Sequence, residues 1–169
     1  MIRWATTHAG MVEALAACDR VLEVGTGTGM MSAFLSRFCS LSATLDNSTD
    51  VLRTARRFAE SIDARFVAMR GDAFRLPFRD DAFHAAYSQG LFEHFSDEEV
   101  RLLAQEQVRV ASRVYVSVPS FYYPHVGRRG PGLVGDERLL VRKRWVEILG
   151  DLVVAARYYA DFKVATVGG

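Results

Sequence analysis

Residues 21–29 constrain the fold of this chain most, because a short apolar run there ends in three closely spaced glycines. The run is Val-Leu-Glu-Val, and a run of this kind predicts a buried parallel strand over residues 21–24. Residues 30–38 then predict a helix. Four of its apolar residues are spaced to share one face: Met31, Phe34, Leu35 and Phe38. A strand, a glycine turn and a helix open a nucleotide-binding βαβ unit, where the missing side chains let a ligand approach the backbone.

The spacing of the glycines narrows the class of ligand. Gly25 and Gly27 fit the first two places of the dinucleotide fingerprint G-x-G-x-x-G/A, but its third place falls on Met30. No Gly-Lys-Ser/Thr follows, which excludes a Walker phosphate loop. The pattern instead runs Glu23-x-Gly25-x-Gly27-x-Gly29 at a strand end. It resembles the first motif of class I S-adenosylmethionine-dependent methyltransferases. An ordinary tight turn between a strand and a helix is the alternative interpretation.

Composition limits the classes of protein to which the chain can belong. With 169 residues, 50% of them hydrophobic, it has the length of one domain and enough apolar residues for a core. The net charge of +1 does not support a role at nucleic acid or at a membrane surface. No apolar run approaches the ~18 residues of a membrane span, and the first residues lack the apolar core of a signal peptide, so we expect a cytoplasmic protein. Cys18 and Cys39 lie among apolar residues, which predicts buried thiols and no disulfide or metal site.

Strand and helix patterns alternate along the rest of the chain. Helices are predicted over residues 10–17, 50–61 and 141–149, and after Ser96, where Glu99 completes a capping box. Strands are predicted over residues 41–45, 64–69, 81–88 and 113–120, with an antiparallel hairpin over residues 151–167. The inward face predicted for the helix over residues 50–61 consists of Val51, Ala55, Phe58 and Ile62. The inward face predicted for the helix after Ser96 consists of Val100, Leu103, Ala104, Gln107, Val108 and Ala111. The sequence therefore predicts one α/β domain over residues 1–169, a Rossmann-like, doubly wound, mostly parallel sheet with a C-terminal antiparallel hairpin.

An acidic residue follows the second predicted strand at a distance typical of nucleotide-binding α/β folds. Asp46 lies 21 residues past Gly25, where a carboxylate accepts hydrogen bonds from ribose hydroxyls. The alternative is an aspartate that serves only the turn before the next helix, since Asn47 and Ser48 follow. The glycine motif together with this offset favours ribose binding.

Further segments strengthen the resemblance to class I methyltransferases, which extends over about residues 21–167. A Gly-Asp-Ala segment in that family faces adenine, which implies that Asp72 and Ala73 contact the base. The segment over residues 88–95 resembles the segment that follows the fourth strand in that family. The end of that strand faces the sulfonium in the family. His84 departs from the family, which usually has Asp there, and we interpret it as structural. The resemblance implies S-adenosyl-L-methionine as cofactor and S-adenosyl-L-homocysteine as product. It implies these cofactor-binding residues: Glu23, Gly25, Thr26, Gly27, Gly29, Asp46, Asn47, Asp72, Ala73, Ser88 and Gln89.

The residues after the fourth predicted strand narrow the methyl acceptor. They include neither the Asp/Asn-Pro-Pro-aromatic motif of amino-methylating enzymes nor the Pro-Cys nucleophile of cytosine-C5 enzymes. We therefore expect a methyltransferase with a small-molecule acceptor and no membrane partner, and a nucleic-acid partner is disfavoured. An inactive cofactor-binding regulatory module, or an RNA or protein methyltransferase, is the alternative. An NAD-dependent oxidoreductase is disfavoured by Met30.

Methyl transfer from a sulfonium needs placement of a nucleophile more than a catalytic side chain, because the sulfonium is already a strong electrophile. His94 and His125 are candidate general bases, since an unperturbed imidazole titrates near neutral pH. Packing is the alternative role for both. A Gly-, Pro- and aromatic-rich loop covers residues 121–135, and its part over residues 121–132 predicts a lid that contacts the acceptor. An ordinary surface loop is the alternative. The candidate acceptor residues are Tyr122, Tyr123 and Arg128. The basic residues between Arg128 and Arg144 are interpreted first as a solvated helix face, with an anionic acceptor and then RNA as the alternatives.

Overall fold

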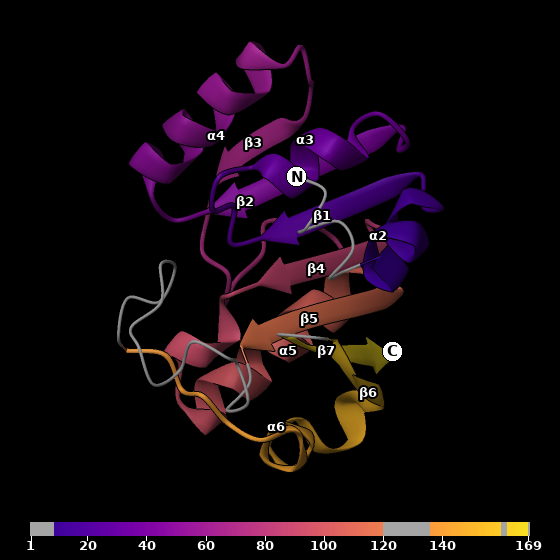
Figure 1. The fold of residues 1–169 in the computed structure, drawn as a ribbon, viewed down its shortest axis with the longest axis vertical. Helices are drawn as coiled ribbons and strands as arrows, with labels where there is room; N and C mark the ends of the chain where they lie inside the picture. Colours follow the sequence, from indigo (N-terminus) through magenta and orange to yellow (C-terminus); the bar gives the residue numbers. More distant parts are fainter. Residues whose placement is uncertain (1–8, 120–135, 160–161, 169) are drawn as a thin grey trace.

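Seven strands form one sheet in the order β3-β2-β1-β4-β5-β7-β6 (Figure 1). The structure is a computed structural model that describes residues 9–119, 136–159 and 162–168. The strands are β1 (Arg20–Val24), β2 (Leu41–Asp46), β3 (Val67–Arg70), β4 (Ala85–Gln89), β5 (Arg113–Pro119), β6 (Val153–Tyr159) and β7 (Phe162–Gly168). The first five pair in parallel, and β7 runs antiparallel between β5 and β6. The predicted mostly parallel, Rossmann-like sheet is confirmed.

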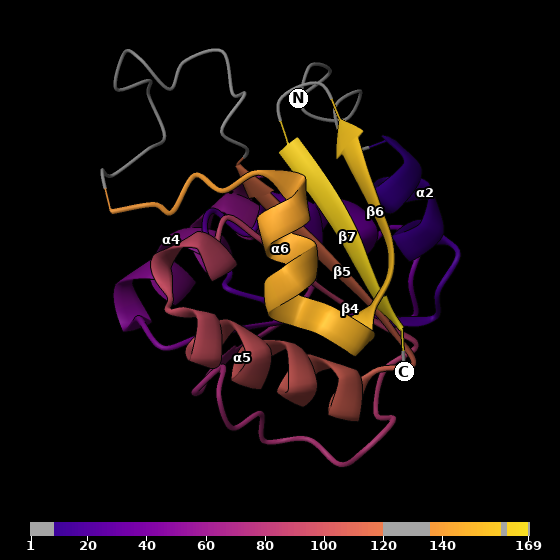
Figure 2. The ribbon, with the colours of Figure 1, turned by 90° about the horizontal axis from the view of Figure 1, so that it is seen from below.

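Helices cover both faces of the sheet. They are α2 (Ala9–Ala16), α3 (Met30–Leu35), α4 (Thr49–Ser61), α5 (Asp97–Val110) and α6 (Arg142–Leu149), with short 3₁₀ turns η1 (Phe92–His94) and η2 (Gly150–Leu152). In Figure 2, α5 and α6 lie on one side of the sheet and α2 on the other. The order of the strands reverses at β1: β2 and β3 lie on one side of it, and β4 and β5 lie on the other. The carboxyl ends of parallel strands on either side of such a point form a crevice for ligands.

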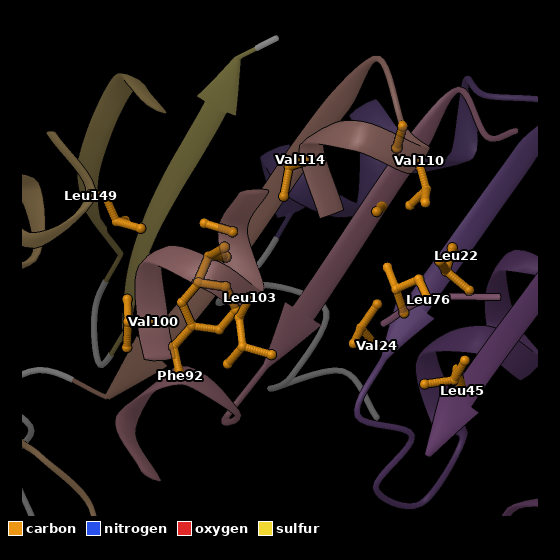
Figure 3. Close-up of a cluster of buried hydrophobic side chains, with 14 of the residues drawn as sticks. Leu22, Val24, Leu45, Leu76, Phe92, Val100, Leu103, Val110, Val114 and Leu149 are labelled. Carbon is orange, nitrogen blue, oxygen red and sulfur yellow. The ribbon is translucent and has the colours of Figure 1, made fainter. Parts of the chain in front are cut away.

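The centre of the sheet is buried on both faces. Successive side chains of a strand point to opposite faces. In β1, Leu22 and Val24 therefore enter the core beneath α5 and α6 (Figure 3), while Val21 enters the core beneath α2 and α3. Leu22 lies opposite Ala43 of β2 and Ala86 of β4, small residues that let the helices approach the sheet. The near-continuous apolar run that predicted β1 follows from this double burial.

Two predicted strands begin later than the sequence indicated. β3 starts at Val67, not at residue 64, because Phe66 packs against the glycine turn, where its ring would lie 3.1 Å from a Cβ added to Gly29. β4 starts at Ala85, not at residue 81, since Asp81 has a positive φ of 52° and turns the chain there.

Two predicted helix faces are partly wrong. The helix predicted over residues 30–38 ends at Leu35, and Phe38 is 58% exposed, with its ring tilted at 45° to that of Phe34. In α4 the buried residues are Leu52, Ala55 and Ala59, whereas Val51, Phe58 and Ile62 are only half-buried. The two faces share Ala55, which packs closely against the glycine turn, and the observed face is rotated about it. In α5, Val110 is buried and Val108 is half-buried.

The predicted helix ends are largely confirmed. The Ser48 side chain accepts from the backbone N–H of Val51, and Ser96 with Glu99 forms a complete capping box. Pro119 is the last residue of β5, and α6 ends at Leu149, immediately before Gly150.

Residues 160 and 161, the centre of the predicted hairpin, lie outside the described residues, as does the predicted lid. The single-domain organisation stays a prediction. Within the described ranges, no helix is long and apolar enough to cross a membrane.

Candidate cofactor-binding site

The glycine turn between β1 and α3 uses its glycines in different ways. Gly29 has a φ of 70° and is buried, and a Cβ added to it would lie 2.7 Å from the Cβ of Ala55. Gly27 has a φ of 49° and is exposed, and a Cβ added there would meet no atom within 4 Å. Both conformations favour glycine. Gly29 therefore brings α4 against the turn, whereas Gly27 keeps open the space in front of it.

Two clefts adjoin at Gly25, each with a volume of about 440 Å³ including its open mouth. The first is lined by Glu23, Gly25, Thr26, Gly27, Thr28, Met30, Met31 and Gln89. The second is lined by Gly25, Leu45, Asp46, Asn47, Gly71, Asp72, Ala73, Phe74, Leu91 and Phe95. Together they follow the carboxyl ends of the parallel strands, as expected for a ligand site in an open α/β sheet. Among the predicted cofactor residues, Gly29 and Ser88 lie outside both clefts.

Asp46 is fixed in the wall of the second cleft by backbone hydrogen bonds. Its Oδ2 accepts from the N–H of Thr26 at 3.0 Å, and its Oδ1 accepts from the N–H of Ser48 at 2.8 Å. Each carboxylate oxygen can accept a further hydrogen bond. The Thr26 hydroxyl is held in turn against the Thr44 hydroxyl at 2.6 Å. Asp46 therefore orders the turn and keeps acceptor capacity, and its binding of ribose stays a prediction.

The wall of the second cleft joins one polar segment to several apolar side chains. Asp72 accepts from the N–H of Phe74 at 2.9 Å, which fixes the turn that presents Ala73. Gly71 lies so close to Leu45 that an added Cβ would approach its Cδ1 to 2.6 Å. The sequence analysis missed the apolar wall formed by Leu45, Phe74, Leu91 and Phe95. Only Phe74 had a local signal, since it directly follows the Gly-Asp-Ala segment.

Glu23 is a buried acid at the floor of the first cleft. It is 4% exposed, and its Oε2 accepts from the Ser32 hydroxyl at 2.5 Å. Burial raises the pKa of Glu23 to about 7, and hydrogen bonds from Ser32, Tyr87 and Thr44 lower it in part. Burial also raises the pKa of Tyr87 well above its usual value, and the negative charge of Glu23 adds to that rise. Tyr87 thus remains a phenol near neutral pH.

The segment after β4, in which Leu91 and Phe95 line the second cleft, also carries a second buried acid and a histidine. His94 Nδ1 lies 3.0 Å from Asp136 Oδ1. Glu93 is 3% exposed, and burial raises its pKa to about 7. The negative charges of Glu137 and Asp136 add to this rise, whereas a backbone hydrogen bond and the charge of His94 lower the pKa in part. His125, Tyr122, Tyr123 and Arg128, the other predicted catalytic and acceptor residues, lie outside the described residues. Their roles stay predictions.

The described part of the basic cluster is paired with acids. Arg138 and Arg144 both donate to Asp97, and Lys143 lies 3.9 Å from Glu147. Arg138 also donates to the backbone oxygen of Phe95. These pairs favour the interpretation of the cluster as a solvated, internally neutralised surface.

Comparison with known proteins identifies the family to which this chain belongs. A methyltransferase domain family matches residues 21–113, which is more than half of the chain and includes both clefts. The chain belongs to this methyltransferase domain family. The predicted class I S-adenosylmethionine-dependent methyltransferase is therefore confirmed, together with its cofactor, S-adenosylmethionine.

A curated relative supports this assignment over part of its length. A protein-L-isoaspartate O-methyltransferase of Rhodopseudomonas palustris (strain BisA53) is 38% identical over 65 residues, which is 38% of this chain and 30% of the relative. The chain therefore matches less than a third of the length of that methyltransferase.

Two solved structures share the fold of this methyltransferase domain. A protein of Pyrococcus horikoshii OT3 is 20% identical, with a TM-score of 0.79 over 98% of this chain and 89% of its own. Magnesium protoporphyrin IX methyltransferase from Synechocystis PCC 6803 with bound SAH is 17% identical, with a TM-score of 0.70 over 96% and 83%. At these identities the likeness concerns the fold alone.

Proposed function

We propose that this protein transfers the methyl group of S-adenosylmethionine to a small-molecule acceptor. The observation that carries the proposal is the pair of clefts that adjoin at Gly25, with the fixed carboxylate of Asp46 in the wall of the second cleft. An elongated ligand with a nucleoside at one end and an amino acid at the other needs two adjoining pockets of this kind. The cytoplasmic location also stays a prediction.

The two ends of the cofactor would meet different surroundings. Asp46 accepts from the ribose hydroxyls, Asp72 and Ala73 contact adenine, and Asn47 borders the sugar. The apolar wall from Leu45 to Phe95 covers the base. Glu23, Thr26, Gly27 and Gln89 surround the amino-acid end, where the open space in front of Gly27 admits the ligand to the backbone. Gly29 and Ser88 act indirectly, since both are buried outside the clefts.

The reaction requires little chemistry from the protein. A lone pair of the acceptor attacks the methyl carbon, the bond from carbon to sulfur breaks, and its electrons stay on sulfur to give S-adenosylhomocysteine. The acceptor loses a proton in the same process. Fixed walls and exclusion of water are the contributions expected of the site. The acceptor would approach over the ends of β4 and β5.

A protein acceptor is the second candidate, because the Rhodopseudomonas palustris relative is named for a protein substrate, L-isoaspartate. The match covers only 30% of that relative, so we rank this acceptor below a small molecule. The net charge of +1 supports neither a nucleic-acid acceptor nor a membrane partner.

The test is a transfer assay with S-adenosylmethionine that carries an isotopically labelled methyl group. Purified protein is incubated with fractions of a metabolite extract and, separately, with an isoaspartyl peptide. We expect the label in a small molecule, with one S-adenosylhomocysteine formed for each methyl transferred. Gly27→Val is the control and should abolish transfer by filling the cleft. Cofactor binding without transfer to any fraction would contradict the proposal and favour an inactive binding module. Transfer to the peptide alone would favour the protein acceptor.

A further inference from the structure

A cluster of potential metal ligands includes His94, which lies between two residues that line the second cleft, Leu91 and Phe95. His94, Asp136 and Glu137 each offer one ligand atom, and these three atoms lie within 4.8 Å of one another. His94 Nδ1 and Asp136 Oδ1 are 3.0 Å apart. Atoms that bind one ion at about 2.1 Å lie roughly 3 to 3.5 Å from each other, so this pair already has the separation of neighbouring ligands.

The backbone holds the two ligand-bearing segments together. The N–H of Arg138 donates to the backbone oxygen of Glu93 at 2.8 Å, one residue from His94 on one side and one residue from Glu137 on the other. The Arg138 guanidinium donates to the backbone oxygen of Phe95 and to Asp97. Because Asp97 neutralises Arg138, this cation is paired outside the cluster. The segment over residues 136–138 is therefore fastened to η1 by contacts that leave the cluster itself in place.

A fourth acidic group, Glu93, lies next to His94 in the chain and is buried. Glu93 is 3% exposed, and its Oε2 has no hydrogen-bond partner among the described residues. The charges of His94, Glu137 and Asp136 act on its carboxyl. A buried carboxylate oxygen without a partner is costly. A cation beside Glu93 would satisfy that oxygen.

We propose that His94, Asp136 and Glu137, together with Glu93, bind a divalent transition-metal ion next to the segment that lines the cofactor cleft. One imidazole with carboxylates suits ions such as Mn²⁺ or Zn²⁺, whereas Mg²⁺ favours oxygen ligands and retained water. The binding site does not depend on the proposed function. Its role in catalysis does rest on that function.

The position of the ion indicates the class of acceptor. Leu91 and Phe95, which lie on either side of His94 in sequence, both line the second cleft. A bound metal ion lowers the pKa of an oxygen ligand. An acceptor hydroxyl bound to the ion would lose its proton to water, and its oxygen would form the new bond to the methyl carbon. The acceptor class is then a small molecule with a metal-chelating hydroxyl group. His94 acts as a ligand through Nδ1 in this arrangement, and not as the general base.

Titration of the purified protein with Mn²⁺, followed by the electron paramagnetic resonance signal of the free ion, tests this site without any acceptor. We expect saturable binding of one Mn²⁺, displaced by Zn²⁺. Asp136→Asn and His94→Gln should each weaken binding roughly tenfold or more, by loss of a ligand. Asp151→Asn, which changes an exposed aspartate paired with Arg101, should bind as the wild type does.

Circular dichroism and calorimetry with S-adenosylhomocysteine accompany each variant. Both variants should keep the fold and the cofactor affinity, which separates this test from that of the proposed function. Wild-type protein that binds neither Mn²⁺ nor Zn²⁺, or variants that bind as the wild type does, would overturn the metal site. The His94 and Asp136 pair would then be a general base and the residue that orients it. Should one variant misfold, the other still decides the question.

Discussion

At the scale of single residues, Glu23 makes the stability of the protein depend on pH. Its pKa in the folded protein is raised to about 7, chiefly by burial, from an ordinary value of 4.5. The folded state therefore prefers the protonated form. The contribution of this group to the free energy of unfolding is complete below pH 4.5 and is lost as the pH rises through about 7, at a cost on the order of 3 kcal/mol.

Glu23→Gln should remove this dependence because the amide stays neutral. Urea denaturation of wild type and variant at pH 5, 6, 7 and 8 measures the difference. We expect the wild type to lose stability relative to the variant as the pH rises. Glu93, whose pKa is also about 7, contributes to both proteins and cancels in the comparison. Parallel curves over this range would show that Glu23 does not titrate there.

Gly27 and Gly29 form a matched pair, because the same substitution meets open space at one and a packed helix at the other. Gly29→Ala should lower the free energy of unfolding by several kcal/mol, from overpacking against Ala55 and a strained positive φ. Gly27→Ala should cost about 1 kcal/mol through φ alone. It should nevertheless weaken S-adenosylhomocysteine binding strongly, since its methyl group enters the cleft. Thermal melts and calorimetry measure both. A Gly27→Ala protein that binds as the wild type does would move the ligand away from the turn.

At the scale of helices and strands, local signals predicted most elements but not their exact faces. The cap at Ser48 and the capping box of Ser96 with Glu99 depend on a few neighbouring residues, so the sequence contained them in full. The predicted and observed inward faces of α4 share Ala55, which meets a glycine 26 residues earlier in the chain. Helical spacing allows either Val51 and Phe58 or Leu52 and Ala59 beside Ala55, and only packing in the folded chain decides between them.

The capping box of α5 gives a prediction at this scale. Ser96→Ala removes the acceptor for the N–H of Glu99 and one donor to its carboxylate, so the free energy of unfolding should fall by about 1 kcal/mol. Ser61→Ala is the control, because Ser61 is an exposed serine near the last turn of α4, with one bond to the backbone oxygen of Phe58. Denaturant unfolding measures both variants. An equal effect of the two substitutions would mean that the box adds nothing beyond loss of a surface hydroxyl.

At the scale of the whole molecule, the sequence predicted the polar part of the site better than its apolar part. The glycine turn, Asp46 and the Gly-Asp-Ala segment follow strand ends, and the fold class brings strand ends to one edge of the sheet. Leu45 belongs to β2, whereas Leu91 and Phe95 lie on either side of η1, so only the folded chain joins them into a wall. Asp136 likewise reaches His94 across 42 residues.

Calorimetric titration of the purified protein with S-adenosylhomocysteine and, separately, with NAD tests the central claim most directly. Both ligands carry an adenosine, so the comparison asks which second half fits the cleft lined by Glu23, Gly27 and Gln89. We predict saturable binding of one S-adenosylhomocysteine per chain and no response to NAD. Tight binding of NAD with no response to S-adenosylhomocysteine would contradict the assignment of these clefts to the methyl donor.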